Sequence, residues 1–238
     1  MSASGPSAVE RVKQSVRGTV RSLLDPLVGA LARAGVDPDH VTWAGLLVTG
    51  VGAVLFAAGR FREGALVAVV GCAMDMVDGA LARRKGGATR WGAFLDSTTD
   101  RIADAALFLG VGVHYARQAL STLKNEDALT DLLLGPPIQT AIVYDGVLEA
   151  IFYAGLAALA MIAALLVSYT RARMEGLGLE CRAGWFERPE RLVVLLGAAL
   201  FGSASPVMKW ALAILVVLSW FTVFQRVAYA RARLHGPA

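Results

Sequence analysis

Long apolar stretches alternate with short polar segments along the chain. Six of these stretches approach the roughly 20 mostly apolar residues that a helix needs to cross the hydrocarbon core of a membrane. They run over residues 41–59, 63–82, 94–116, 147–169, 192–201 and 207–229. The fifth is the shortest and reaches into its polar flanks, and the second and third contain aspartates. The pattern predicts an all-α integral membrane protein with six transmembrane helices.

A basic amphipathic segment precedes the first span. Between Val9 and Ala34, basic residues recur among apolar ones at the spacing of a helix. The segment is either a helix with a solvated face beside the membrane or a helix lying in the headgroup plane, and both place it at an anionic surface. The first 40 residues hold no apolar run of signal length with a cleavage site, so we expect no cleavable signal. We expect a cytoplasmic amphipathic helix in residues 1–37 and a transmembrane domain over residues 38–238.

The composition agrees with a membrane protein. Of the 238 residues, 56% are hydrophobic and 18% are charged, whereas soluble domains are about one quarter charged. These values argue against an ordinary soluble globule and against a disordered chain. Two cysteines are too few for a disulfide scaffold or for a metal site with four thiolates.

The distribution of lysine and arginine predicts the orientation of the spans, because cytoplasmic connections are enriched in both residues. If both termini and the connections after the second and fourth spans lie on one side, that side holds all but five of the 23 basic residues. The five exceptions are Arg60, Arg62, Arg117, Lys124 and Lys209. We therefore expect a multi-pass protein of the cell membrane with both termini in the cytoplasm.

Two further features of the sequence limit the possible partners. The long outer connection over residues 117–146 shows no catalytic pattern, and it either holds a short helix or is mobile. The net charge of +4 needs no nucleic acid to explain it, because the basic residues cluster at the ends of spans and no nucleic-acid-binding motif is present. We expect membrane lipids, and no nucleic acid, as partners.

Four aspartates lie where the second and third spans reach the cytoplasmic side. Asp75 and Asp78 are three residues apart and Asp96 and Asp100 are four apart, so each pair shares one face of its helix. A short glycine-containing loop joins the two helices into an antiparallel hairpin, in which the acidic faces can oppose each other. A carboxylate in a bilayer costs roughly 2.5–3.5 kcal/mol on insertion scales, so the cluster must be hydrated, protonated or loaded with cations. Oxygen ligands without His or Cys favour hard ions such as Mg²⁺, Mn²⁺ or Ca²⁺, and two divalent ions would neutralise the four carboxylates.

Small residues surround the aspartates. Gly79 and Ala82 lie about one turn after Asp78 and leave room for a ligand against the helix. Gly92 precedes Asp96 by one turn and allows a close approach of helices. Arg83 projects near the acidic cluster, where an anionic ligand would bridge it to the metal ions.

Together these residues form the spaced pattern D-x2-D-G-x2-A-R-x8-G-x3-D-x3-D, which begins at Asp75 and ends at Asp100. With all eight positions matched, about residues 38–226 resemble the CDP-alcohol phosphotransferase family. The resemblance implies a membrane enzyme with six spans and a cytoplasmic acidic site, and it also implies a homodimer.

The resemblance implies roles for individual residues. The four aspartates would hold two divalent cations, Mg²⁺ or Mn²⁺. Asp100 would also be the catalytic base that takes the proton from the acceptor hydroxyl. Gly79, Ala82 and Arg83 would line the cytidine diphosphate site of a CDP-lipid.

A second, shorter motif lies at the start of the first span. Residues 38–42, Pro-Asp-His-Val-Thr, resemble the family's P-[ND]-x-x-T segment, which would place Asp39 and Thr42 near the nucleotide. The same two residues also suit the N-cap of a helix.

Arginines on the cytoplasmic side favour a phosphorylated acceptor. Arginine is the residue best suited to bidentate phosphate recognition, and five arginines are candidates: Arg171, Arg173, Arg188, Arg191 and Arg226. The segments S-Y-x-[KR]-A-R and E-R-P-E-R resemble the phosphatidylinositol phosphate synthases of actinobacteria and related archaeal enzymes. That group joins CDP-diacylglycerol, or an archaeal equivalent, to inositol phosphate and releases CMP; by the resemblance Arg171, Arg188 and Arg226 are the phosphate ligands.

Two alternatives remain open from the sequence. Within the family, a phosphatidylglycerophosphate synthase would use glycerol-3-phosphate, which is also a phosphorylated alcohol. In another class, a divalent-cation transporter would also place carboxylates in a membrane, but it would need acids along a whole path. Asp104 is the one further acid, a turn deeper than Asp100, and we expect it to make a polar packing or water contact.

Overall fold

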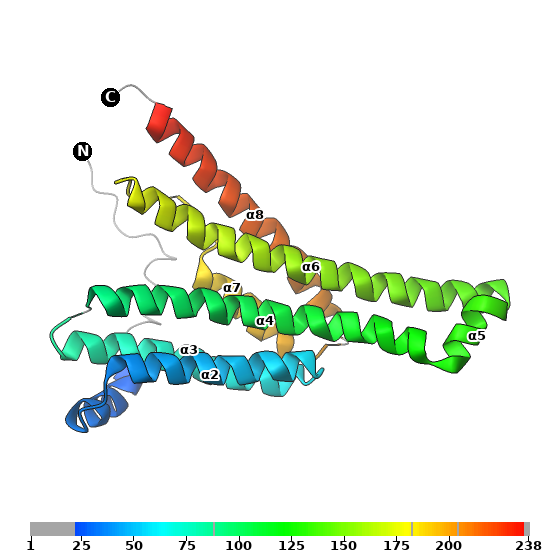
Figure 1. Cartoon of the computed structure of the whole chain (residues 1–238), viewed down its shortest axis with the longest axis horizontal. Coiled ribbons are helices and arrows are strands. Elements are labelled where there is room, and N and C mark those ends of the chain that lie inside the picture. Colours follow the sequence, from blue (N-terminus) through cyan, green and yellow to red (C-terminus); the bar gives the residue numbers. More distant parts are fainter. Residues whose placement is uncertain (1–21, 88, 182, 204, 236–238) are drawn as a thin grey trace.

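The computed structural model describes residues 22–87, 89–181, 183–203 and 205–235, and every regular element in these ranges is a helix. A helix over residues 22–33 comes first. The helices that follow are α2 (Pro38–Ala57), α3 (Phe61–Arg84), α4 (Arg90–Lys124), α5 (Glu126–Leu134), α6 (Pro137–Gly176), α7 (Arg188–Ala199) and α8 (Pro206–His235) (Figure 1). Four of them, α2, α3, α6 and α8, are long and apolar enough to cross a membrane. The all-helical, multi-pass membrane architecture expected from the sequence is confirmed over the described residues.

Local capping fixes where two of the helices near the acidic motif begin. The Asp37 carboxylate accepts a hydrogen bond from the Asp39 amide at 3.1 Å, and Pro38 occupies the first turn of α2, where its missing N–H does no harm. The Thr89 hydroxyl accepts from the Gly92 amide at 2.9 Å and caps α4. Both helix starts therefore follow directly from the sequence.

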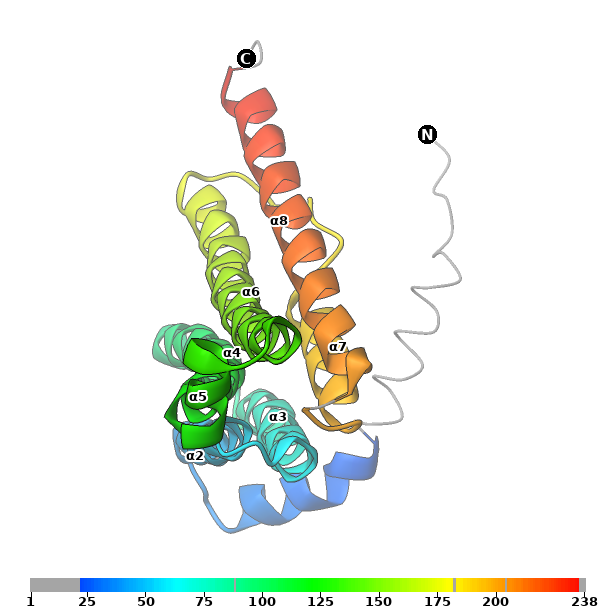
Figure 2. The ribbon, with the colours of Figure 1, turned by 90° about the vertical axis from the view of Figure 1, so that its right-hand side faces the viewer.

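The helices pack in two neighbouring groups. Viewed along the bundle, α2, α3 and α4 form one group and α6, α7 and α8 the other (Figure 2). α4 packs against α6, and α7 packs against both α3 and α8. The core between them is apolar, with fully buried side chains that include Phe56, Phe61, Leu107, Leu212 and Leu215.

Two predicted spans coincide with helices other than the four that are long and apolar enough to cross a membrane. The third span falls within α4, whose 35 residues are long enough to cross a membrane but carry more charge. The fifth overlaps α7 up to Ala199 and continues into the turn that follows; the 12 residues of α7 extend only about 18 Å at 1.5 Å per residue. Helix length and apolarity alone therefore do not establish six spans.

The outer connection expected over residues 117–146 is almost entirely helical. α4 continues to Lys124, the side chain of Asn125 caps α5, and α6 begins at Pro137. The joined ends of α4 and α6 project beyond α2 and α3 (Figure 1). The apolar pattern underestimated both helices because it identifies only their apolar portions, and a helix with a solvated face gives no such signal.

The helix over residues 22–33 is attached to the bundle by an apolar face. Val28 is fully buried and packs with Val77 and Leu81 of α3. Arg84, at the end of α3, donates to the Asp25 carboxylate at 3.2 Å. The helix runs crosswise to α2 and α3 (Figure 2). The first half of the predicted amphipathic helix, up to residue 21, lies outside the described residues.

Close packing of α2 against α4 depends on Gly110. A methyl group at this position would overlap the Ala53 carbonyl oxygen, whereas one at Gly112 would lie 3.6 Å from the Ala157 methyl group, at ordinary contact distance. We expect Gly110→Ala to cost about 1–3 kcal/mol of stability, because backbone must move. Gly112→Ala should be neutral or slightly stabilising. Thermal unfolding in detergent measures both; equal melting temperatures for the two variants would contradict this packing role.

Candidate active site

The four predicted aspartates converge from α3 and α4. One carboxylate oxygen from each of Asp75, Asp78 and Asp96 lies within 4.8 Å of the other two. Asp78 is 4% exposed, Asp75 is partly buried, and Asp96 is exposed. Asp100, one turn further along α4, borders the same site from the α4 side. The opposed acidic faces expected from the residue spacing are therefore present.

The three convergent carboxylates suit a divalent cation. They offer only hard oxygen ligands, and their spacing allows one ion to be shared among them. Asp78 is nearly inaccessible to water, and a buried anion of this kind requires a cation or strong hydrogen-bond donors. The donor set fits Mg²⁺ or Mn²⁺.

The short motif at the start of α2 contacts the acidic site. The Thr42 hydroxyl donates to Asp78 Oδ2 at 2.5 Å. The Asp39 carboxylate accepts from Trp91 Nε1 at 2.8 Å and so joins the starts of α2 and α4. Both predicted nucleotide residues therefore lie at the same end of the bundle as the aspartates, with Thr42 in direct contact with one of them.

The residues expected to line the CDP site follow the aspartates along α3. Gly79 and Ala82 are partly exposed, and Arg83 is exposed. A methyl group at Gly79 would lie 3.4 Å from Arg83 Nη1, at ordinary contact distance, so the Arg83 guanidinium lies beside Gly79 on the helix surface. These three residues follow Asp78 on α3 and are accessible to solvent, but they are not among the described residues that line the two pockets beside the aspartates.

Arg188, the first residue of α7, inserts its guanidinium among the carboxylates. Its Nη1 lies 2.8 Å from Asp75 Oδ2 and 2.6 Å from Asp100 Oδ1, and its Nε donates to Asp104 Oδ1 at 3.1 Å. One guanidinium thus pairs with three carboxylates. The sequence suggested a phosphate ligand here, and the structure places Arg188 at the border between the acidic site and the arginine-lined cleft.

Asp104 and Arg191 form a buried ion pair behind Arg188. Asp104 is 5% exposed and Arg191 is 1% exposed, and Arg191 Nη2 donates to Asp104 Oδ2 at 2.9 Å. We expected a polar packing or water contact for Asp104, and the structure shows a polar contact that is stronger than expected, because the carboxylate pairs with two arginines. Its spacing of four residues from Asp100 was the available signal, since it continues the acidic face of α4 by one turn.

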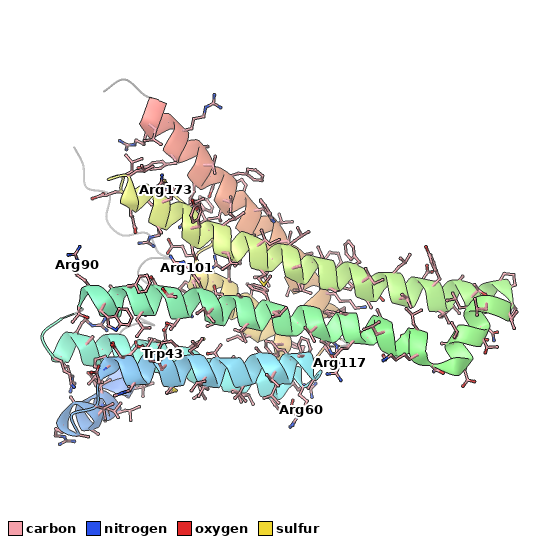
Figure 3. All side chains as sticks on the ribbon, in the orientation of Figure 1. Trp43, Arg60, Arg90, Arg101, Arg117 and Arg173 are labelled. Carbon is pink, nitrogen blue, oxygen red and sulfur yellow. The ribbon has the colours of Figure 1, made fainter. Side chains whose placement is uncertain are left out.

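A cleft of about 450 Å³ opens beside the aspartates, between α4, α6, α7 and α8. Its lining includes Asp96 and Asp100 and four of the five predicted arginines: Arg171, Arg188, Arg191 and Arg226. Arg101 of α4 also lines the cleft and was not identified as a site residue from the sequence. Arg173 does not line it; it lies near the end of α6 (Figure 3).

Two of the cleft arginines are held by other groups of the protein. Arg226 is 2% exposed, its Nε donates to the Ala183 carbonyl at 3.0 Å, and its Nη1 donates to the Val167 carbonyl. Arg171 Nε donates to Glu175 Oε1 at 2.9 Å. These bonds fix the buried Arg226 guanidinium at the wall of the cleft, whereas Arg171 is oriented by an ion pair that is about half exposed.

A cluster of carboxylates beside a cleft lined by arginines suits phosphoryl chemistry between two anionic substrates. A sequence model of the CDP-alcohol phosphatidyltransferase family matches residues 36–225. The chain belongs to this family and is a membrane-bound transferase.

Similar proteins of known name are inositol phosphate lipid synthases. The chain is 36% identical to the phosphatidylinositol phosphate synthase of Mycobacteroides abscessus, covering 90% of this chain and 86% of the relative. It is 30% identical to the archaetidylinositol phosphate synthase of Methanothermobacter thermautotrophicus, covering 96% of this chain and 99% of the relative.

Solved structures show the same fold. Mycobacterium tuberculosis phosphatidylinositol phosphate synthase with CDP-DAG bound has a TM-score of 0.66 and 31% identity, covering 87% of this chain and 92% of that one. The same enzyme in complex with manganese and citrate has a TM-score of 0.65 and 30% identity, covering 86% and 87%. The expected family and its resemblance to the inositol phosphate synthases are therefore confirmed.

Arg188 is the main counter-ion of the acidic site. The effect of replacing it on protein stability can therefore be measured without any substrate. We expect Arg188→Gln to lower the unfolding free energy of the metal-free protein by about 2 kcal/mol, less than for a fully buried pair because the side chain is 22% exposed. Thermal unfolding in detergent with a chelator measures the loss. Added Mn²⁺ should then stabilise the variant more than the wild type, because Asp75 and Asp100 no longer share their oxygens with a guanidinium.

Arg188→Lys is the matched control for this experiment. Lysine keeps the charge, but its single ammonium cannot reproduce the geometry of the guanidinium among three carboxylates. The stability of Arg188→Lys should therefore fall between those of the wild type and Arg188→Gln. Identical melting temperatures for the wild type and Arg188→Gln in chelator would rule out the counter-ion role.

Proposed function

We propose that the protein transfers a phosphatidyl group from CDP-diacylglycerol, or a related CDP-lipid, to inositol phosphate and releases CMP in phospholipid biosynthesis. The observation that carries the proposal is that Asp96 and Asp100 line the same cleft as arginines from α6, α7 and α8. An acidic site alone would suit any member of the family, whereas the adjoining arginines suit an acceptor that carries a phosphate. The relatives named for inositol phosphate products agree with this acceptor.

The proposed metal ligands are Asp75, Asp78, Asp96 and Asp100, which would hold two ions of Mg²⁺ or Mn²⁺. Such ions would stabilise negative charge on the oxygens of the pyrophosphate. Support comes from the three-carboxylate convergence and from the manganese in the related mycobacterial structure. Thr42 orients Asp78 through its hydrogen bond, so this carboxylate is already directed at the site.

Asp100 is the proposed base. It must take the proton of the acceptor hydroxyl as that oxygen attacks the phosphorus, which requires a carboxylate within hydrogen-bond reach of the acceptor. Asp100 lines the cleft and the acidic site together, so it can contact both substrates. Arg188, paired with Asp100, holds the carboxylate at this border.

The two substrates would occupy opposite sides of Asp100. The CDP-lipid would lie along the solvent-accessible side of α3, with its cytidine diphosphate at Gly79, Ala82 and Arg83 and near Asp39 and Thr42. The acceptor phosphate would lie in the cleft, bound by a set of arginines: Arg171, Arg188, Arg191 and Arg226. Arg173 would remain at the membrane surface, outside this set.

We propose six membrane spans, with α4 and α7 as the third and fifth. α4 is about 52 Å long. α7 begins among the carboxylates and ends at Ala199, and the next carbonyl, of Leu200, accepts from Arg62 Nε near the start of α3 at 3.1 Å. It would therefore span the outer part of the membrane, from the depth of the acidic site to the outer surface.

The proposed orientation places the acidic site and both termini in the cytoplasm. Arg90 and Arg173 lie toward one end of the bundle, whereas Arg60 and Arg117 lie where α2 ends (Figure 3). The first group belongs to the side richer in basic residues. The helix over residues 22–33 would lie in the cytoplasmic headgroup region, consistent with its crosswise direction (Figure 2). Family resemblance further supports a homodimer.

A panel of acceptors tests the reaction. With CDP-diacylglycerol and Mg²⁺ or Mn²⁺ in detergent or liposomes, we expect CMP release with inositol phosphate and much less with inositol or serine. Glycerol-3-phosphate shares the phosphate, so faster release with it would assign the alternative function. Asp100→Asn should lower the rate by at least about 100-fold. Absence of CMP release with every phosphorylated polyol, or flux of Mn²⁺ across liposomes without CMP, would contradict the proposal.

Membrane orientation is testable by labelling single cysteines in a background in which Cys72 and Cys181 are replaced. Cysteine at Arg90 should react with an impermeant reagent only from the cytoplasmic side, and cysteine at Arg60 only from the outer side. Labelling of both positions from one side would overturn the topology.

A further inference from the structure

The junction before α7 carries two opposite charges at the border of the cleft. Arg188 faces the carboxylates, as described above, and Glu187, immediately before it, faces arginines. The Glu187 carboxylate therefore occupies the position beside these arginines that an anionic ligand would take.

A single oxygen of Glu187 lies between two helices. Its Oε1 is 3.7 Å from Arg171 Nη1 of α6 and 3.4 Å from Arg226 Nη2 of α8. A phosphate oxygen bridging two arginines would have the same partners. The carboxylate and the acceptor phosphate cannot both occupy this position.

Both arginines have hydrogen-bond partners other than Glu187. The Ala183 and Val167 carbonyls accept from two nitrogens of Arg226, and Glu175 accepts from Arg171 at 2.9 Å. The nitrogens that face Glu187 are different ones, Nη2 of Arg226 and Nη1 of Arg171. Removing Glu187 would leave a preorganised pair of donors.

Glu187 itself is weakly held. It is the N-cap residue of α7, but its side chain makes no capping hydrogen bond, and this side chain is 47% exposed. The Arg171–Glu187 pair is about half exposed on both sides and 3.7 Å long, so water screens it and it contributes little to stability. The contact with Arg226 is also long, at 3.4 Å, although that guanidinium is buried. The carboxylate can turn to solvent without disturbing the helix that follows.

We infer that Glu187 is an exchangeable internal counter-ion, displaced from Arg171 and Arg226 when the phosphate of the acceptor binds. The inference rests on the proposed function and identifies Glu187 as a specificity-determining residue. A phosphate dianion can form paired hydrogen bonds to both guanidinium groups and so outcompetes one carboxylate oxygen. A neutral polyol offers no such replacement and leaves Glu187 in place.

Glu187→Gln tests the exchange, because it keeps the shape and removes the charge. We expect the KM for inositol phosphate to fall on the order of threefold, the scale of half-exposed ion pairs, measured against the KM for CDP-diacylglycerol in the same preparation. Glu175→Gln is the matched control: it removes a carboxylate from the same arginine but makes no contact with Arg226. An unchanged or higher KM for Glu187→Gln, or an equal fall in both variants, would overturn the inference.

A binding measurement separates this inference from the proposed function. Inorganic phosphate should raise the melting temperature of Glu187→Gln more than that of the wild type or Glu175→Gln; equal shifts would overturn the inference even where turnover is normal. Arg171→Gln should raise the KM for inositol phosphate. Failure of the wild type to release CMP would instead contradict the proposed function. An unchanged KM for inositol phosphate in Arg171→Gln would contradict the assignment of the cleft as the acceptor site.

Discussion

Charge compensation inside an apolar bundle is the constraint on which the rest of the structure depends. Asp75, Asp78, Asp100 and Asp104 all lie at least partly below the protein surface, where an unpaired carboxylate is strongly unfavourable. Most of the cationic charge comes from α7, which contributes Arg188 and Arg191 from its first two turns. The short α7 helix has to begin at the depth of the aspartates, because its first residue is their counter-ion.

This requirement also explains why the acidic site and the arginine-lined cleft adjoin. Arg188 lines both the acidic site and the cleft. Any change in the charge of its carboxylate partners therefore alters the electrostatic potential in the cleft. Asp75 lies nine residues before the end of α3, or about 13 Å along the helix. In the proposed reaction both substrates would therefore meet below the last turn of the bundle, where a lipid would present its head group without leaving the membrane.

The sequence predicted the acidic site better than it predicted the cleft. The aspartates are close in the chain and their helical spacing is unambiguous, so local geometry alone brings Asp75 near Asp78 and Asp96 near Asp100. The pairing of Arg188 with Asp75 joins residues 113 positions apart, and no local pattern encodes it. Basic residues near a membrane also serve orientation, so the sequence could not separate Arg173, which lies outside the cleft, from Arg171, which lines it.

The same distinction applies to the helices. Apolar length identified α2, α3, α6 and α8 because these helices have enough lipid-compatible surface in one stretch. It could not give the full length of α4 and α6, whose outer ends are partly polar, nor separate a short buried helix such as α7 from a full span. In both cases tertiary neighbours, and not composition, determine where the helix ends.

The projecting ends of α4 and α6 have a practical consequence. Arg117 donates to the Ala57 carbonyl at the end of α2, and beyond this level α5 packs mainly against α4 and α6. Among the described residues, none of those that line the acidic site or the cleft lies in α5. It is therefore suited to carry an inserted reporter or an epitope for a binding protein, which would add a rigid external feature for imaging a small membrane protein while leaving its chemistry intact.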